Sequence, residues 1–97
     1  MGTMEYKFKA SDSPVHPEHI GERLARAREA AEKSKAEVCR DLRIDKSAYS
    51  KYEKGTRGLP VHTAYELSVY LRVDLNYLLA GQVHSLPLEA ARRLNIT

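Results

Sequence analysis

The 97-residue sequence predicts a compact, all-α domain of five short helices. Apolar residues recur at intervals of three and four, which is the spacing of one helix face. Ser34, Asp45 and Asp74 stand where helix-capping residues are expected, and Gly55 and Gly81 stand where helices end. The sequence holds no pair of alternating segments that would form a sheet. We therefore expect a helical bundle with a short N-terminal arm and a C-terminal helical extension.

Residues 1–16 are expected to form a flexible arm. They show no helical periodicity, and the run from Ser11 to Pro14 is typical of a loop. The first helix is expected from Pro17, because a proline at the first helical position sacrifices no hydrogen bond. Its inward face follows spacings of four, three and four residues along Ile20, Leu24, Ala27 and Ala31.

Two short helices follow and are joined by a tight turn. The first begins at Lys35, because Ser34 and Glu37 form a capping box. The next spans residues 46–54. Only residues 43–45 join the two, so the helices must cross steeply, as in a helix-turn-helix. The residues expected to hold this crossing together are Val38, Cys39, Leu42, Ile44, Tyr49 and Tyr52.

The remaining sequence predicts two further helices and an extension. The fourth helix is expected from Pro60, and the fifth lies between Asp74 and Gly81. The expected inward residues of the fourth helix are Ala64, Leu67 and Leu71, and the apolar residues of the fifth are Leu75, Leu78 and Leu79. Residues 82–97 carry apolar side chains three apart and are expected to form another short helix. The predicted organisation is thus an arm (1–16), a helical domain (17–81) and an extension (82–97).

The positive charge is concentrated in one part of the chain. The formal net charge is +3, from 16 basic and 13 acidic residues. Residues 23–57 hold eleven of the basic residues and six of the acidic ones. Such a block attracts phosphate and can steer a polyanion, although a solvated helical surface is the simpler interpretation.

Several classes of protein are excluded by composition. No window approaches the roughly 20 apolar residues of a membrane span. The N-terminus lacks the apolar block of a secretory signal. The single cysteine, Cys39, excludes an internal disulfide and a multi-cysteine zinc site, and we interpret it as a small buried residue. We therefore expect a cytoplasmic protein without membrane attachment.

The sequence gives no basis for catalysis. It contains no paired carboxylates, no nucleophile beside a base and no phosphate-binding glycine loop. His16 and His19 have a spacing that can hold a metal, but no second pair or cysteine lies near them in sequence. We expect neither enzymatic activity, nor a cofactor, nor a metal.

Four segments in order carry a resemblance to a known family. They are Ile20-Gly-Glu-Arg-Leu-Ala-Arg-Ala-Arg28, Ser34-Lys-Ala-Glu-Val-Cys39, Ile44-Asp-Lys-Ser-Ala-Tyr-Ser-Lys-Tyr-Glu-Lys-Gly55 and Val73-Asp-Leu-Asn-Tyr-Leu-Leu-Ala-Gly81. Through them, residues 20–81 resemble the helix-turn-helix domain of Cro and the phage repressors, the XRE family. The resemblance implies a lambda-repressor-like fold of five helices that binds double-stranded DNA.

The sequence departs from this family at three places. Arg43 and Arg72 stand where the family usually has glycine, and Lys33 stands where an apolar residue is common. A non-glycine residue in the left-handed conformation costs roughly 1 kcal/mol, which a folded domain tolerates.

The resemblance also implies which residues contact DNA. Helix 46–54 would enter the major groove, where Lys46, Ser47 and Lys51 would contact base edges. The expected phosphate contacts are Lys35, Arg43, Ser50, Lys54 and Arg57. In the resembled family an arginine of the first helix pairs with the glutamate ending the third, and these positions hold Arg28 and Glu53.

These features predict a sequence-specific transcriptional regulator, most simply a repressor acting as a homodimer on a palindromic operator. The alternative is an antitoxin or another protein-interaction module that also binds its own operator. The dimer surface is expected on the fifth helix or on residues 83–94, which could instead fold back over the core. The candidates on the fifth helix are Leu75, Asn76, Tyr77 and Leu79. Tyr65, Tyr70 and Tyr77 are expected at the core edge or in the dimer surface.

Overall fold

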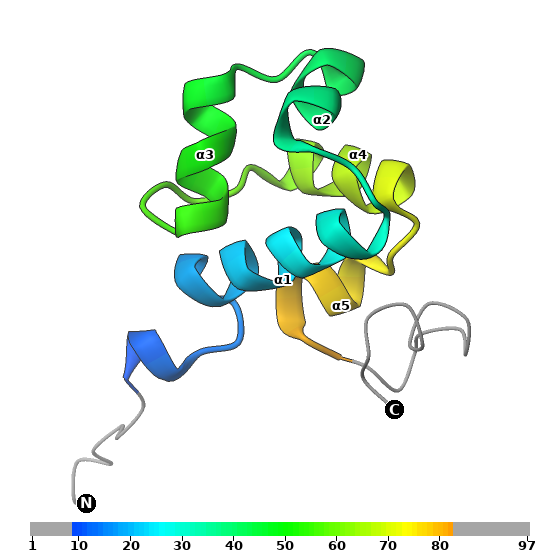
Figure 1. Cartoon of the computed structure of the whole chain (residues 1–97). Coiled ribbons are helices and arrows are strands. Elements are labelled where there is room, and N and C mark those ends of the chain that lie inside the picture. Colours follow the sequence, from blue (N-terminus) through cyan, green and yellow to red (C-terminus); the bar gives the residue numbers. More distant parts are fainter. Residues whose placement is uncertain (1–8, 83–97) are drawn as a thin grey trace, which may run out of the picture.

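A computed structural model describes residues 9–82, which form five α-helices after one turn of 3-10 helix (Figure 1). No strand occurs in this part of the chain, so the predicted all-α class is confirmed. The elements are η1 (Ala10–Asp12), α1 (Pro17–Ala30), α2 (Lys35–Leu42), α3 (Lys46–Lys54), α4 (Val61–Leu71) and α5 (Leu75–Ala80). The first half of the predicted arm and nearly all of the predicted extension lie outside the described residues. Among residues 9–82, no helix combines the length and the apolar composition that a bilayer crossing requires.

The helices begin where the capping residues predict. Ser34 and Glu37 form a complete capping box, in which each residue's side chain accepts the other's main-chain N–H at 3.0 Å. Asp45 and Asp74 accept main-chain N–H groups in the first turns of α3 and α5. α4 begins one residue later than predicted, because Pro60 is its N-cap rather than its first residue.

Four of the five helices, α2 to α5, end on residues in the left-handed conformation. Gly55 and Gly81 end α3 and α5 with φ values of 77° and 70°. Arg43 and Arg72 end α2 and α4 in the same conformation, with φ values of 55° and 58°. The turns therefore keep the left-handed geometry without glycine, at a cost of roughly 1 kcal/mol each.

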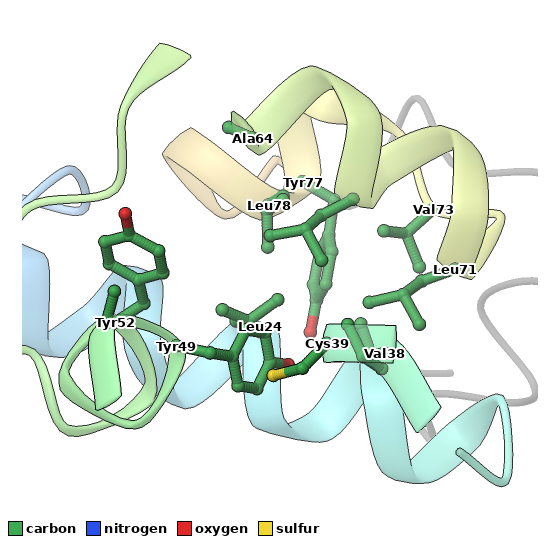
Figure 2. Close-up of a cluster of buried hydrophobic side chains, with 13 residues drawn as sticks. Leu24, Val38, Cys39, Tyr49, Tyr52, Ala64, Leu71, Val73, Tyr77 and Leu78 are labelled. Carbon is green, nitrogen blue, oxygen red and sulfur yellow. The ribbon is translucent and has the colours of Figure 1, made fainter. Parts of the chain in front are cut away.

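The core draws on every helix, as Figure 2 shows. Cys39 is 4% exposed, and its sulfur lies beside the ring of Tyr49, so it is the small buried residue that the sequence predicts. Tyr77 differs from the expectation, since it is 2% exposed and extends into the core. The expectation that Tyr77 lies at a core edge or a dimer surface is therefore wrong. The largest fully buried side chains are Tyr49, Leu24, Leu67, Leu71, Leu78 and Val38.

The part of the arm that the structure describes is attached to α1. The His16 ring accepts the main-chain N–H of Glu18 at 3.2 Å and caps α1. His19 Nε2 donates to the main-chain oxygen of Ser11 at 2.8 Å. Each of the two histidines considered for a metal thus has a ring nitrogen engaged in a local contact. Within residues 9–82, no cluster of three or more His, Cys, Asp or Glu side chains could hold a metal ion.

Arg23 joins the two ends of the described fold. Its Nε donates to the main-chain oxygen of Leu78 at 2.9 Å, and its Nη2 to that of Leu79 at 3.0 Å. Nη2 also donates to the main-chain oxygen of Pro14. One half-buried guanidinium therefore holds the last turn of α5 against α1 and fixes the start of the domain.

Candidate nucleic-acid interface

α3 has one buried face and one face open to solvent. Ala48, Tyr49 and Tyr52 are buried, at 9%, 0% and 7% exposure. Their spacing of one, three and four residues places them on one side of the helix. The exposed residues of the same helix are Lys46, Ser47, Lys51 and Lys54. The buried tyrosines thus fix the helix from behind while its basic side chains stay in solvent.

The end of α3 lies directly against α1, and two glycines make this possible. A Cβ atom on Gly21 would come within 2.4 Å of the main-chain oxygen of Glu53. A Cβ on Gly55 would come within 2.5 Å of the Glu18 Cα, and Gly55 also has a positive φ. Both contacts involve backbone atoms, so a side chain at either position would push α3 away from α1.

A buried ion pair locks the same junction. Arg28 Nε donates to Glu53 Oε2 at 2.7 Å, and Arg28 Nη2 donates to Oε1 at 3.3 Å. The two side chains are only 13% and 6% exposed. Arg28 Nη1 also donates to the main-chain oxygen of Lys33 at 2.9 Å, which ties down the turn before α2. The hydrogen bond with Glu53 raises the pKa of Arg28, against the opposing effect of burial.

Lys35 lies at the edge of this ion pair. Its ammonium is 4.0 Å from Glu53 Oε1, and its side chain is 49% exposed. Because the contact is long and open to water, it holds Lys35 only weakly. The first residue of α2 therefore presents a cation beside the start of a helix, where anions are favoured.

The other predicted phosphate contacts occupy the turn, the end of α3 and the loop after it. Arg43 and Lys54 are exposed, whereas Ser50 is half-buried. Arg57 is exposed, and its guanidinium carbon lies 5.9 Å from the centre of the Tyr52 ring. This cation–π contact gives the loop after α3 a preferred side-chain position.

Exposed cations recur along the helix-turn-helix segment and the loop after it. We use the term basic surface for the exposed cations Lys35, Arg43, Lys46, Lys51, Lys54 and Arg57. They come from the start of α2, the turn, α3 and the loop after α3. Phosphate groups could approach such a surface without displacing any buried side chain.

Two contacts that position this surface are not evident from the sequence. The Tyr70 hydroxyl on α4 donates to the Asp41 carboxylate at the end of α2, and Lys33 lies 5.6 Å from the Tyr70 ring centre. Gly21 is the second case. A glycine inside a predicted helix costs about 1 kcal/mol, and this cost could have indicated a close backbone approach.

Comparisons with known proteins agree with this geometry. A family model described as a helix-turn-helix domain matches residues 21–82, which is more than half of the chain. No curated protein and no solved structure matches. The matched range includes α2, its turn and α3, together with most of α1 and all of α4 and α5. The chain therefore belongs to the helix-turn-helix domain family, whose members of this kind are DNA-binding regulators.

Proposed function

We propose that this protein is a sequence-specific regulator of transcription that places α3 in the major groove of double-stranded DNA. The observation that supports this most strongly is the two-sided character of α3. Its inner face is immobilised by Tyr49 and Tyr52, while its outer face is cationic. A groove about 12 Å wide accepts one such helix.

The residues at the start of α3 would contact base edges. Lys46 and Ser47 are the first two residues of the helix, and Lys51 lies just over one turn further along. Lysine donates to the O6 and N7 acceptors of guanine, and serine can donate or accept. All three are exposed, so binding requires no rearrangement of the core.

The remaining polar residues would contact phosphates and set the position of α3. They lie at the start of α2, in the turn, at the middle and end of α3 and in the loop after it, and they are Lys35, Arg43, Ser50, Lys54 and Arg57. Lys35 would exchange its long contact with Glu53 for a phosphate, while the Arg28–Glu53 pair keeps its own hydrogen bonds. Such contacts fix orientation without selecting sequence.

The regulator would act as a homodimer on a palindromic operator. One recognition helix contacts only a few base pairs, and a second helix one turn away, about 34 Å, doubles the site. Repression is the simplest output, because a bound dimer obstructs other proteins at the same DNA.

Selection from random DNA duplexes tests the proposal, followed by salt titration on the selected site. The logarithm of the binding constant should fall with log salt, by about 0.9 per neutralised phosphate. Lys35→Ala should weaken all duplexes alike, whereas Lys51→Ala should also relax one base position by about 1–3 kcal/mol.

Lys9→Ala is the matched control, because Lys9 is exposed on the arm, outside the basic surface. It should change neither affinity nor base preference. The proposal would be contradicted if the selection enriched no DNA sequence, or if the binding constant did not change with salt concentration. Identical behaviour of the Lys35 and Lys51 variants would contradict the division into phosphate and base contacts.

A further inference from the structure

An exposed apolar row lies on α4, a helix that carries none of the residues assigned to DNA. Val61, Tyr65 and Val69 follow one another at four-residue intervals and are 72%, 60% and 61% exposed. Within residues 9–82, they are three of the four large apolar side chains that are exposed. We name this row the α4 ridge. Isolated exposed apolar residues are common, but an ordered row is typical of a contact surface.

A hollow of about 380 Å³ lies beside the ridge. Its walls are Leu42, Tyr65, Glu66, Val69 and Tyr70. The wall formed by Tyr70 is held in place, because its hydroxyl donates to Asp41 and the Lys33 ammonium lies near its ring. Ridge and hollow therefore lie next to each other on a surface that α2 and α4 hold rigid together.

We propose that the α4 ridge is the surface through which two copies of this chain associate, with the two α4 helices antiparallel. This inference rests on the DNA-binding function proposed above, which calls for a dimer. A two-fold interface must be complementary to itself. When the two-fold axis passes near Tyr65, Val61 of each copy meets Val69 of the other copy. Each α4 ridge then lies beside the hollow of the other copy.

The charges on α4 suit this arrangement. Glu66 is the only acidic residue of α4, which holds no lysine or arginine, and His62 lies one turn before it on the same exposed face. Antiparallel packing brings His62 of one copy towards Glu66 of the other, and the symmetry repeats the contact. The composition of α4 is also more apolar than that of α1, α2 or α3. A polyanion would gain little from such a face, whereas a second copy would cover it.

α5, one of the two segments expected to form the dimer surface, exposes fewer side chains than α4. Tyr77 and Leu78 are buried in the core of their own chain. Leu75 and Leu79 are half-buried, so Asn76 is the one exposed residue of α5. The described part of the chain therefore favours α4 over α5 as the contact helix.

The size of the face predicts a weak dimer. A stable interface buries about 800 Å² per partner, and one face of an eleven-residue helix provides only part of this area. Association should therefore be dependent on concentration in solution. It should become strong where an operator holds two copies side by side.

Sedimentation equilibrium of the full chain, without DNA, tests this inference. The unmodified chain should show a concentration-dependent dimer, and Tyr65→Glu should raise its dissociation constant at least about tenfold. Val69→Lys is a second variant with the same expected effect, should Tyr65→Glu fail to fold. Asn76→Glu on α5 is the matched control and should leave the dissociation constant unchanged, with circular dichroism confirming that all three variants are helical.

Other results would overturn the inference. A chain that stays monomeric at every concentration would do so, as would a dimer weakened by Asn76→Glu but not by the α4 variants. Loss of the dimer in Leu94→Glu, with Tyr65→Glu unaffected, would assign the contact to residues 83–97. Binding of Tyr65→Glu to long DNA at low salt separates the two proposals. This binding depends on the basic surface, so it should persist whether or not the α4 ridge forms the dimer. Its absence would contradict the DNA-binding proposal and not the α4 interface.

Discussion

The exposed residues of α3 include three lysines, whereas those of α4 include two valines and a tyrosine. Both helices bury large residues with similar regularity: Tyr49 and Tyr52 in α3, Leu67 and Leu71 in α4. The spacing of the buried residues therefore determines that each helix joins the same core. The chemical type of the exposed side chains determines which partner each helix can contact. Lysines on α3 suit a polyanion, and apolar side chains on α4 suit another protein surface.

The two helices also differ in how they are attached. α3 is joined to α1 by close backbone contact at Gly21 and by the buried pair of Arg28 and Glu53. α4 is attached by apolar burial and by the hydrogen bond from Tyr70 to Asp41. Substitutions at the two attachments should therefore differ in how much stability and DNA binding they remove.

Glu53→Gln should have the largest effect, because it leaves the Arg28 guanidinium buried without its counter-charge. Removing one partner of a buried ion pair costs about 3–5 kcal/mol. The free energy of unfolding, measured by urea titration, should fall by that amount, and the variant should lose DNA binding as α3 detaches.

Glu29→Gln is the control for this variant. Glu29 also lies near Arg28, at 3.8 Å, but its side chain is 69% exposed, so we expect a change below about 0.5 kcal/mol. Equal losses in the two variants would show that the buried pair does not anchor α3.

Arg43→Gly and Arg43→Ala should separate backbone strain from phosphate binding. Both remove the guanidinium, but only glycine relieves the left-handed conformation at φ 55°. The glycine variant should therefore be more stable than the alanine variant by about 1 kcal/mol in urea unfolding. Both should weaken DNA binding equally in a filter-binding assay. Stronger binding by the glycine variant would mean that the turn, and not the charge, limits affinity.

Tyr77→Phe should have the smallest effect, and in the stabilising direction. The Tyr77 hydroxyl is buried and has no hydrogen-bond partner among the described residues. Its removal should raise the free energy of unfolding by as much as about 1 kcal/mol, as a shift in the urea midpoint. Tyr70→Phe is the matched control, because it removes a hydroxyl that donates to Asp41 and should be destabilising. A loss of stability in Tyr77→Phe would show that its hydroxyl has a partner.

Local signals explain why so much of the fold could be predicted. The capping box at Ser34, the caps at Asp45 and Asp74, and the glycine ends at Gly55 and Gly81 depend on residues close in sequence. Apolar periodicity also identified the inward faces of α3 and α4 correctly. The DNA contacts themselves stay predictions, because they require a partner as well as a fold.

Contacts between distant segments could not be predicted in this way. The burial of Tyr77 depends on how α5 packs against the other helices, and the role of Gly21 depends on a backbone 32 residues away at Glu53. The exposure of the α4 ridge is of the same kind. Val61 and Val69 are apolar, and only the packed structure shows that nothing in the described chain covers them.

The three hydrogen bonds of Arg23 have a consequence for how this protein is made. α1 leaves the ribosome early, but the main-chain oxygens of Leu78 and Leu79 follow about 55 residues later. Until then the Arg23 guanidinium lacks its acceptors on α5, and α1 lacks one wall of its core. Domains generally fold as units during synthesis. Completion of this fold should therefore wait until α5 has emerged, so a nascent chain halted before Leu78 should remain sensitive to protease.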